Sequence, residues 1–203
     1  MIQDDARTDD RAEAAEQRAE DIALIRRIAD GDQHALALLY DRFSTMLLAL
    51  ARRVLHDDSE AEEILQEAFL QVWRQAGRYD DRRSSVATWL VLITRSRAID
   101  RLRTRQVIGR TLDNLQQETR TAHTSPEGIR SVLDEQRRKR LLGALADLPP
   151  EQRQVLELAF YSGMTQSEIA ADTGIPLGTV KTRTLLAMKK LRKALESELR
   201  ELL

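Results

Sequence analysis

The stretch from Thr165 to Arg183, TQSEIAADTGIPLGTVKTR, constrains the fold more than any other part of this chain. Thr165 and Glu168 have the S/T-x-x-E spacing of a capping box, which predicts a helix that opens directly after the threonine. Gly174 follows where a chain leaving that helix needs a positive φ, and Pro176 suits the first turn of a second helix. The pattern therefore predicts a helix-turn-helix.

The second helix of this motif is strongly cationic. From Pro176 to Leu195 the chain has no acid and six basic side chains: Lys181, Arg183, Lys189, Lys190, Arg192 and Lys193. A cationic helix presented by a tight turn has the geometry that enters a DNA major groove. An ordinary helical hairpin with a solvated basic face would require spacing, caps and charge to coincide by accident.

Charge is segregated along the chain, although the net charge is only −1. Residues 57–73 contain six acids and no base, whereas residues 82–110 contain eight arginines and one aspartate. Together with the cationic helix near the carboxyl end, this distribution predicts two separate places where a polyanion can bind.

Composition favours helices and an intracellular setting. Charged residues make up 32% of the 203 residues and aromatic residues only 4%, a mixture typical of amphipathic helices rather than sheets. Cysteine is absent, which suits a reducing cytoplasm without proving it. No apolar run approaches the roughly 20 residues that span a bilayer, and the acidic amino terminus is unlike a signal peptide. We expect a soluble cytoplasmic protein with no membrane insertion of its own.

Helical periodicity predicts an all-α fold of two small helical domains joined by a flexible linker, the second domain containing the helix-turn-helix. The expected boundaries are a disordered acidic tail over 1–20, a first domain over 21–105, a linker over 106–128 and a second domain over 129–203. Asp32 is expected to cap one helix of the first domain, and Asp58 or Ser59 the next. The basic helix that follows is expected from about Val86 to Arg103.

Three segments, in this order, resemble a sigma factor of the extracytoplasmic-function (ECF) group of the sigma-70 family. They are DDSEAEEILQEAFLQVW (Asp57 to Trp73), TWLVLITRSRAIDRLR (Thr88 to Arg103) and LPPEQRQVLELAFYSGMTQSEIAADTGIPLGTVKTR (Leu148 to Arg183). The resemblance extends over nearly the whole chain from Ile22 to Leu195. It implies a promoter-specificity subunit that binds core RNA polymerase and promoter DNA and is held inactive by a cognate anti-sigma factor.

For the first domain, the resemblance places polymerase binding on the acidic helix and −10 recognition and melting on the basic helix and the loop before it. The implied polymerase contacts are Glu60, Glu63, Gln66, Glu67, Leu70 and Gln71. The implied −10 contacts are Arg82, Arg83, Ser84, Arg95, Ser96, Arg97, Arg101 and Arg103. Trp89 is expected in the core rather than stacked on a base, whereas Tyr79 is open between the two roles.

For the second domain, the resemblance places −35 recognition on the helix-turn-helix. The implied contacts are Thr179, Lys181, Thr182, Arg183 and Leu186, with help from Leu185. Members of the family commonly have arginine at the positions of Leu186 and Met188, so either fewer phosphate or base contacts on that face or a different −35 preference is expected here. The linker matches in position a segment that threads toward the RNA exit path, and a plain tether fits its residues equally well.

The sequence shows no arrangement for catalysis. His34, His56 and His123 lie apart, without metal-ligand spacing or a paired acid, and the carboxylate pairs lie in solvated acidic runs. We expect no enzyme activity, no cofactor and no metal.

Two other functions remain open. A helix-turn-helix regulator acting without polymerase would bind duplex DNA alone, and it leaves the arginine block at 82–110 unexplained. A sigma-like decoy that titrates an anti-sigma factor would never bind DNA, which the basic recognition helix argues against.

Overall fold

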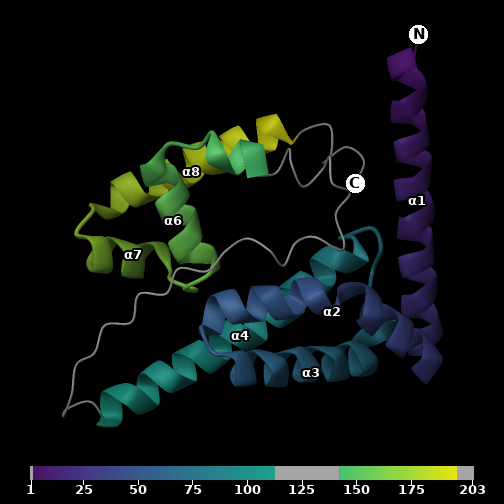
Figure 1. Ribbon diagram of the computed structural model, residues 1–203. Coiled ribbons are helices and arrows are strands. Elements are labelled where there is room, and N and C mark those ends of the chain that lie inside the picture. Colours follow the sequence, from purple (N-terminus) through teal and green to yellow (C-terminus); the bar gives the residue numbers. More distant parts are fainter. Residues whose placement is uncertain (1, 113–141, 196–203) are drawn as a thin grey trace.

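A computed structural model describes the backbone of residues 2–112 and 142–195, and side chains within 15–105 and 142–195. Every element in these ranges is helical, which confirms the all-α prediction (Figure 1). The N-terminal unit contains α1 (Ile2–Ala29), α2 (Gln33–Leu55), α3 (Asp58–Gln75), the short 3₁₀ helix η1 (Ala76–Arg78) and α4 (Val86–Leu112). The C-terminal unit contains α6 (Pro150–Phe160), α7 (Gln166–Thr173) and α8 (Leu177–Ala194).

The helix boundaries in the N-terminal unit follow local chemistry. Gly31 adopts φ +89° after α1, and the Asp32 carboxylate accepts the backbone N–H groups of His34 and Ala35 to cap α2, as predicted. The predicted cap of α3 is wrong by one residue. The side chain of Asp57, not of Asp58 or Ser59, accepts the N–H of Glu60, because Asp57 has the extended backbone that a capping residue needs.

Helix α2 lies at the centre of the N-terminal unit. Its apolar positions Leu39, Phe43 and Leu47 are completely buried against α1, α3 and α4. A second apolar cluster lies further along the same helices, around Val54 of α2 and Ile99 of α4. The two clusters make α3 and α4 neighbours, so the acidic helix and the arginine helix lie side by side (Figure 1).

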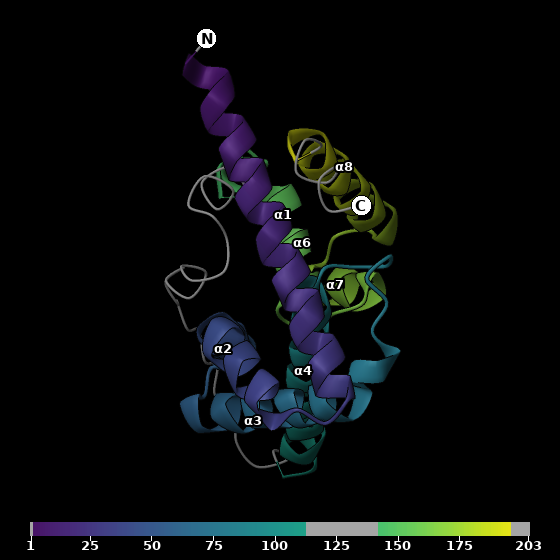
Figure 2. The same ribbon diagram turned by 90° about the vertical axis from the view of Figure 1, so that its right-hand side faces the viewer.

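Two helices are longer than the sequence predicts. Helix α1 begins at Ile2 and projects past the rest of the unit, where a disordered tail is predicted over 1–20 (Figure 2). Its later turns are held by charge: Arg42 of α2 pairs with Glu20 and Asp21 of α1. Burial raises the pKa of Asp21, although Arg42 acts in the opposite direction.

Helix α4 continues to Leu112, seven residues into the predicted linker. Arg105 supports this extension because its guanidinium binds the backbone oxygen of Leu55 and the Glu60 carboxylate. The rest of the predicted linker, residues 113–128, and the first part of the predicted helix 132–145 lie outside the described residues.

The C-terminal unit is a helix-turn-helix supported by α6. Thr165 and Glu168 form the predicted capping box, and Gly174 has φ +69° at the end of α7. Pro176 stands one residue before α8 rather than in its first turn. Val155, Ile169 and Val180, one from each helix, form the buried core. None of the described helices is long and apolar enough to cross a membrane.

Candidate nucleic-acid and polymerase interface

Helix α8 presents the side chains that the sequence assigns to −35 recognition. Val180 and Ala187 face the core and are fully buried, which turns Thr179, Lys181 and Thr182 to solvent. Arg183 is half-buried on the next position of the turn. The hydroxyl of Thr182 donates to the Gly178 carbonyl at 2.9 Å, so its methyl group and oxygen lone pairs are available for contacts outside the protein.

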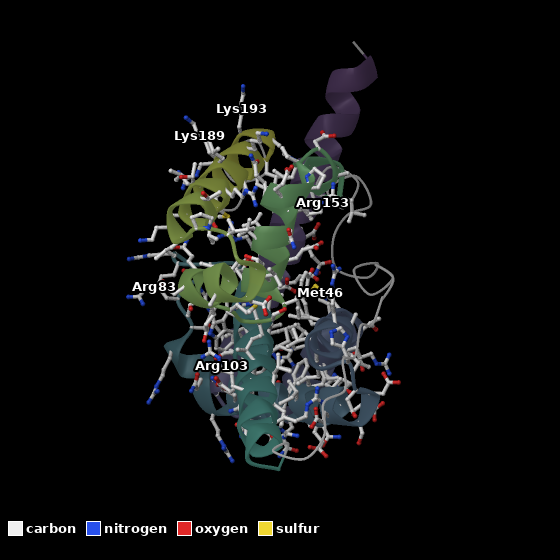
Figure 3. The ribbon with its side chains drawn as sticks, turned by 90° about the vertical axis from the view of Figure 1, so that its left-hand side faces the viewer. Met46, Arg83, Arg103, Arg153, Lys189 and Lys193 are labelled. Atoms are coloured by element: carbon white, nitrogen blue, oxygen red, sulfur yellow. The ribbon has the colours of Figure 1, made fainter. Side chains whose placement is uncertain are left out.

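The cations of α8 are unpaired within the described residues. No acid of the described ranges forms an ion pair with any lysine or arginine of this helix. Figure 3 shows Lys189 and Lys193 pointing outward from the same helix. Leu185 and Leu186 are also exposed, with 68% and 42% of their surface accessible. Helix α8 is therefore a cationic surface with two apolar side chains at its middle.

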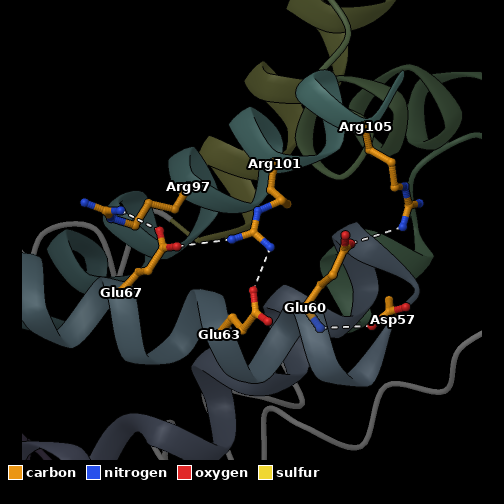
Figure 4. A network of polar contacts seen from close by, with 7 residues as sticks. All are labelled: Asp57, Glu60, Glu63, Glu67, Arg97, Arg101 and Arg105. Atoms are coloured by element: carbon orange, nitrogen blue, oxygen red, sulfur yellow. Dashed lines mark hydrogen bonds and ion pairs between the residues drawn. The ribbon is translucent and has the colours of Figure 1, made fainter. Parts of the chain in front are cut away.

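The arginines of α4 are in the opposite condition, because three of them bind the acidic helix α3 (Figure 4). Arg97 donates to the Glu67 carboxylate at 2.7 Å and to the Gln71 amide oxygen at 2.6 Å. Arg101 bridges Glu63 at 2.8 Å and Glu67 at 3.1 Å. The hydrogen bond that Arg101 donates to the Glu63 carboxylate raises the pKa of Arg101 above its ordinary value.

Arg105 also pairs with α3, because its guanidinium lies 3.1 Å from the Glu60 carboxylate. We call these residues the arginine ladder: Arg97, Arg101 and Arg105 of α4 with Glu60, Glu63, Glu67 and Gln71 of α3. Two of the expected −10 arginines, Arg97 and Arg101, thus bind three of the expected polymerase contacts, which are Glu63, Glu67 and Gln71. The pairing is absent from the predictions made from sequence, although the spacing of four residues between successive arginines of the ladder is a signal for it.

The remaining two expected −10 arginines of α4 turn to the C-terminal unit. Arg95 donates from Nε to the carbonyl of Phe160 and from Nη2 to the carbonyl of Ala159, both at 2.7 Å. Arg103 donates to the carbonyl of Gly163 at 2.9 Å. The structure therefore divides the predicted −10 arginines between two faces of α4 instead of bringing them to one surface.

The loop before α4 is ordered by its own contacts. The Tyr79 hydroxyl donates to the Ser84 carbonyl at 2.8 Å, and Ser85 caps α4 by accepting the N–H of Thr88. The ring of Tyr79 lies 5.2 Å from that of Trp89, which is half-buried against the larger core cluster as expected. Tyr79 has therefore a structural role in this loop.

The expected −10 residues of this region differ in exposure. Arg82 and Arg83 are exposed, and Arg83 makes a 3.3 Å pair with Asp80 and points outward in Figure 3. Ser84 is half-buried, whereas Ser96 is exposed on α4. The accessible part of the expected −10 set is thus the loop with its two arginines, together with Ser96.

The outer face of α3 carries the accessible part of the expected polymerase contacts. Gln66 is exposed, 54% of the surface of Leu70 is accessible, and 58% of the Glu63 side chain remains accessible beside Arg101. These three side chains follow one another at i, i+3 and i+7, so they form one stripe. Glu60, Glu67 and Gln71 lie on the side that faces α4.

Comparison with known proteins gives a consistent result. Two sigma-70 family models match the chain: Sigma-70 region 2 over residues 39–107 and Sigma-70, region 4 over residues 144–193. The ECF RNA polymerase sigma factor SigK of Mycobacterium ulcerans (strain Agy99) is 35% identical over 186 residues, which cover 89% of this chain and 96% of the relative.

SigK of Mycobacterium tuberculosis (strain ATCC 25618 / H37Rv) is 34% identical over 179 residues, covering 86% of this chain and 92% of the relative. Among solved structures, SigE of Rhodobacter sphaeroides in complex with the anti-sigma ChrR is 34% identical with a TM-score of 0.43, covering 87% of this chain and 98% of that one. On the family models and the curated relatives, this chain belongs to the ECF RNA polymerase sigma factors of the sigma-70 family.

Proposed function

We propose that this sigma factor directs core RNA polymerase by reading −35 DNA with the exposed face of α8. The carrying observation is that Thr179, Lys181 and Thr182 stand in solvent around the buried anchor Val180, on a helix without a paired cation in the described residues. Lysine and arginine bind guanine edges, and threonine or leucine contacts a base or a thymine methyl group. Arg183, Leu185 and Leu186 extend the same surface.

The α3 stripe is the proposed first contact with core polymerase. Glu63 and Gln66 supply acidic and polar groups beside the accessible Leu70, and this arrangement suits a basic partner surface. Charge complementarity of this kind gives fast and oriented association more than high affinity. Glu60, Glu67 and Gln71 join the contact where the partner displaces ladder arginines.

The −10 element is the proposed ligand of α4 and its preceding loop. Arg82 and Arg83 offer exposed guanidinium groups for phosphates, while Ser84 and Ser96 offer hydroxyl groups for further hydrogen bonds with DNA. Arg95, Arg97, Arg101 and Arg103 join them after exchanging their present partners. Holding bases out of the stack at this surface would assist melting of the −10 duplex.

An anti-sigma factor is the proposed regulatory partner. SigE of Rhodobacter sphaeroides is seen with such a protein, the anti-sigma ChrR. In this chain Leu70, Leu92, Leu185 and Met188 remain at least half exposed, and a clasping partner would cover them. We propose no catalytic role for the chain, since the polymerase performs the chemistry, and we place its action in the cytoplasm with that enzyme.

Run-off transcription tests this function directly. Purified core polymerase is supplied with a pool of genomic promoter fragments, with and without the protein. Discrete new transcripts that disappear with Lys181→Ala or Arg183→Ala are expected. Duplex binding without transcripts would favour the regulator, and capture of an anti-sigma factor without any DNA binding would favour the decoy.

A further inference from the structure

The side of α8 that points away from the core is apolar, although the helix as a whole is cationic. Because Val180 and Ala187 are buried, the helical repeat of 3.6 residues turns the opposite side to solvent. Four exposed residues lie on that side, and we call them the apolar face of α8: Gly178, Thr182, Leu185 and Leu186. The two leucines have 68% and 42% of their surface accessible. Neighbouring apolar side chains in this condition mark a binding surface.

The apolar face has little capacity for hydrogen bonds. The side chains of glycine and leucine have none. The Thr182 hydroxyl donates its proton to the Gly178 carbonyl at 2.9 Å, so it can only accept a further hydrogen bond and its methyl group is left for contacts outside the protein. Donors that could bind a guanine edge stand at the margins of the face, on Lys181 and on Lys189, which points outward in Figure 3.

Gly178 is a second unusual feature of this face. Its φ is not in the left-handed region, and a Cβ atom at this position would meet no atom within 4 Å. A glycine in a helix lowers the stability of that helix relative to alanine. No contact among the described residues therefore explains the glycine. The close approach of another molecule to the backbone of α8 would explain it.

The chemistry of the face favours one ligand. The cations of α8 have no ion-pair partner among the described residues, and they attract a nucleic acid rather than an apolar protein segment. In the major groove the apolar group of a base pair is the C5 methyl group of thymine. A face of leucine and methyl groups without free donors suits thymine better than guanine or adenine.

We propose that the apolar face of α8 makes this sigma factor select thymine in the −35 element. Thymine methyl groups pack on Leu185, Leu186 and the Thr182 methyl group, and Gly178 lets the bases approach the helix backbone. This inference rests on the proposed −35 role of α8 and adds the class of base that the helix selects.

Replacing thymine by deoxyuridine removes the methyl group and keeps the base pair. The probe is a promoter fragment recovered by run-off transcription, with deoxyuridine at every thymine of its −35 element, in competition binding with the holoenzyme. The wild type should lose about fourfold in affinity for each methyl group in contact. Leu186→Ala should bind the thymine promoter more weakly and lose much less on the uracil promoter. Lys181→Ala is the matched control, which should bind more weakly but keep the full uracil effect.

Gly178→Ala separates DNA binding from stability. The added methyl group should raise the urea midpoint of the C-terminal unit, because alanine favours a helix over glycine. It should also weaken promoter binding by about fivefold or more, because it fills a close contact with DNA. Gly143→Ala is the control, since Gly143 is exposed within the helical residues 142–146 and its added Cβ atom also meets no atom within 4 Å. It should raise the midpoint without changing promoter binding.

Three results would overturn the proposal. They are −35 elements that lack thymine, equal affinity of the wild-type holoenzyme for thymine and uracil promoters, and wild-type promoter binding by Gly178→Ala. Equal affinity would assign the two leucines to a protein partner instead of DNA. Failure of the proposed function has another signature, which is the absence of transcripts from core polymerase with the wild-type protein. The two failures are therefore separate observations.

Discussion

Helices α4 and α8 are both basic, yet their charges are used in different ways. All five arginines of α4 from Arg95 to Arg105 bind carboxylates, an amide or backbone carbonyls of the protein. The lysines and arginines of α8 have no ion pair in the described part of the chain. Helix α8 is thus ready for DNA as it stands, whereas α4 must exchange protein partners for phosphates.

The number of basic residues in a helix therefore does not tell how many of them are free to bind DNA. An exposed ion pair contributes about 0.2–1 kcal/mol, so no single pair of α4 prevents DNA binding. Releasing several of these pairs together, along with the hydrogen bonds to the carbonyls of α6, costs more free energy and opposes DNA binding by α4 more strongly. On the proposed function, α8 needs no rearrangement to bind the −35 element, whereas α4 must release its protein partners to bind the −10 element.

The first prediction concerns Lys181 of α8, whose substitution should have the strongest consequence for promoter binding. Lys181→Ala in the holoenzyme should weaken promoter binding by about 1–3 kcal/mol, because an unpaired lysine gives its full contact to DNA. Competition binding on a promoter from the run-off experiment measures the loss. The same variant should match the wild type on a template whose −35 element is scrambled. An equal loss on both templates would show that Lys181 does not read the −35 element.

The second prediction concerns the cap of α7, the helix that packs against α8. Thr165→Ala deletes the hydroxyl that accepts the Glu168 N–H, and the loss of such a cap should lower the free energy of unfolding of the C-terminal unit by about 1 kcal/mol. Urea unfolding followed by circular dichroism measures the change. Ser167→Ala, an exposed substitution in the same helix, is the control and should stay within about 0.5 kcal/mol of the wild type. A Thr165→Ala variant as stable as the control would contradict the role of the cap.

The contrast between the helices also shows what sequence can predict. Local chemistry gave the helix-turn-helix, because the capping box, Gly174 and the buried positions of α7 and α8 act within a few residues. The helical periodicity of apolar residues predicted the helices of the N-terminal unit in the same way. The adjacent acidic and arginine blocks were visible as blocks of charge.

The pairing of those blocks depends on tertiary packing. Glu67 and Arg97 are thirty residues apart, and only the packing of α3 and α4 against α2 and against each other brings them to 2.7 Å. The contact of Arg95 with Phe160 spans sixty-five residues and no local pattern marks it. Periodicity predicts which face of a helix is polar, but it does not predict which partner that face will meet.

The third prediction weakens the arginine ladder. Glu67→Gln removes the carboxylate shared by Arg97 and Arg101, and single-strand binding by the free protein should tighten by up to about fivefold, the equivalent of about 1 kcal/mol. Its dependence on salt should become steeper as more arginines bind phosphates. Glu62→Gln also removes one negative charge from α3, but Glu62 pairs with Arg52 of α2 and not with the ladder. This variant therefore controls for the general electrostatic effect. Equal gains in the two variants would mean that the ladder does not restrain its arginines.

The fourth prediction concerns the threonine hydroxyl groups of the two helices. In α8 the hydroxyls of Thr182 and Thr184 donate to carbonyls of their own helix at 2.9 Å. In α4 the side chain of Thr94 is completely buried and its hydroxyl has no partner among the described residues. A buried hydroxyl without a hydrogen bond opposes folding, and valine has nearly the same shape.

Thr94→Val should therefore leave the free energy of unfolding of the N-terminal unit unchanged or raise it by up to about 1 kcal/mol. Chemical denaturation measures the change, with the exposed Thr104→Val as the control because its hydroxyl donates to the Asp100 carbonyl. A loss of more than about 1 kcal/mol would mean that the Thr94 hydroxyl is hydrogen-bonded in solution. If the prediction holds, the stability of α4 comes from its apolar face and its arginine contacts, and those contacts are the ones that DNA binding would replace.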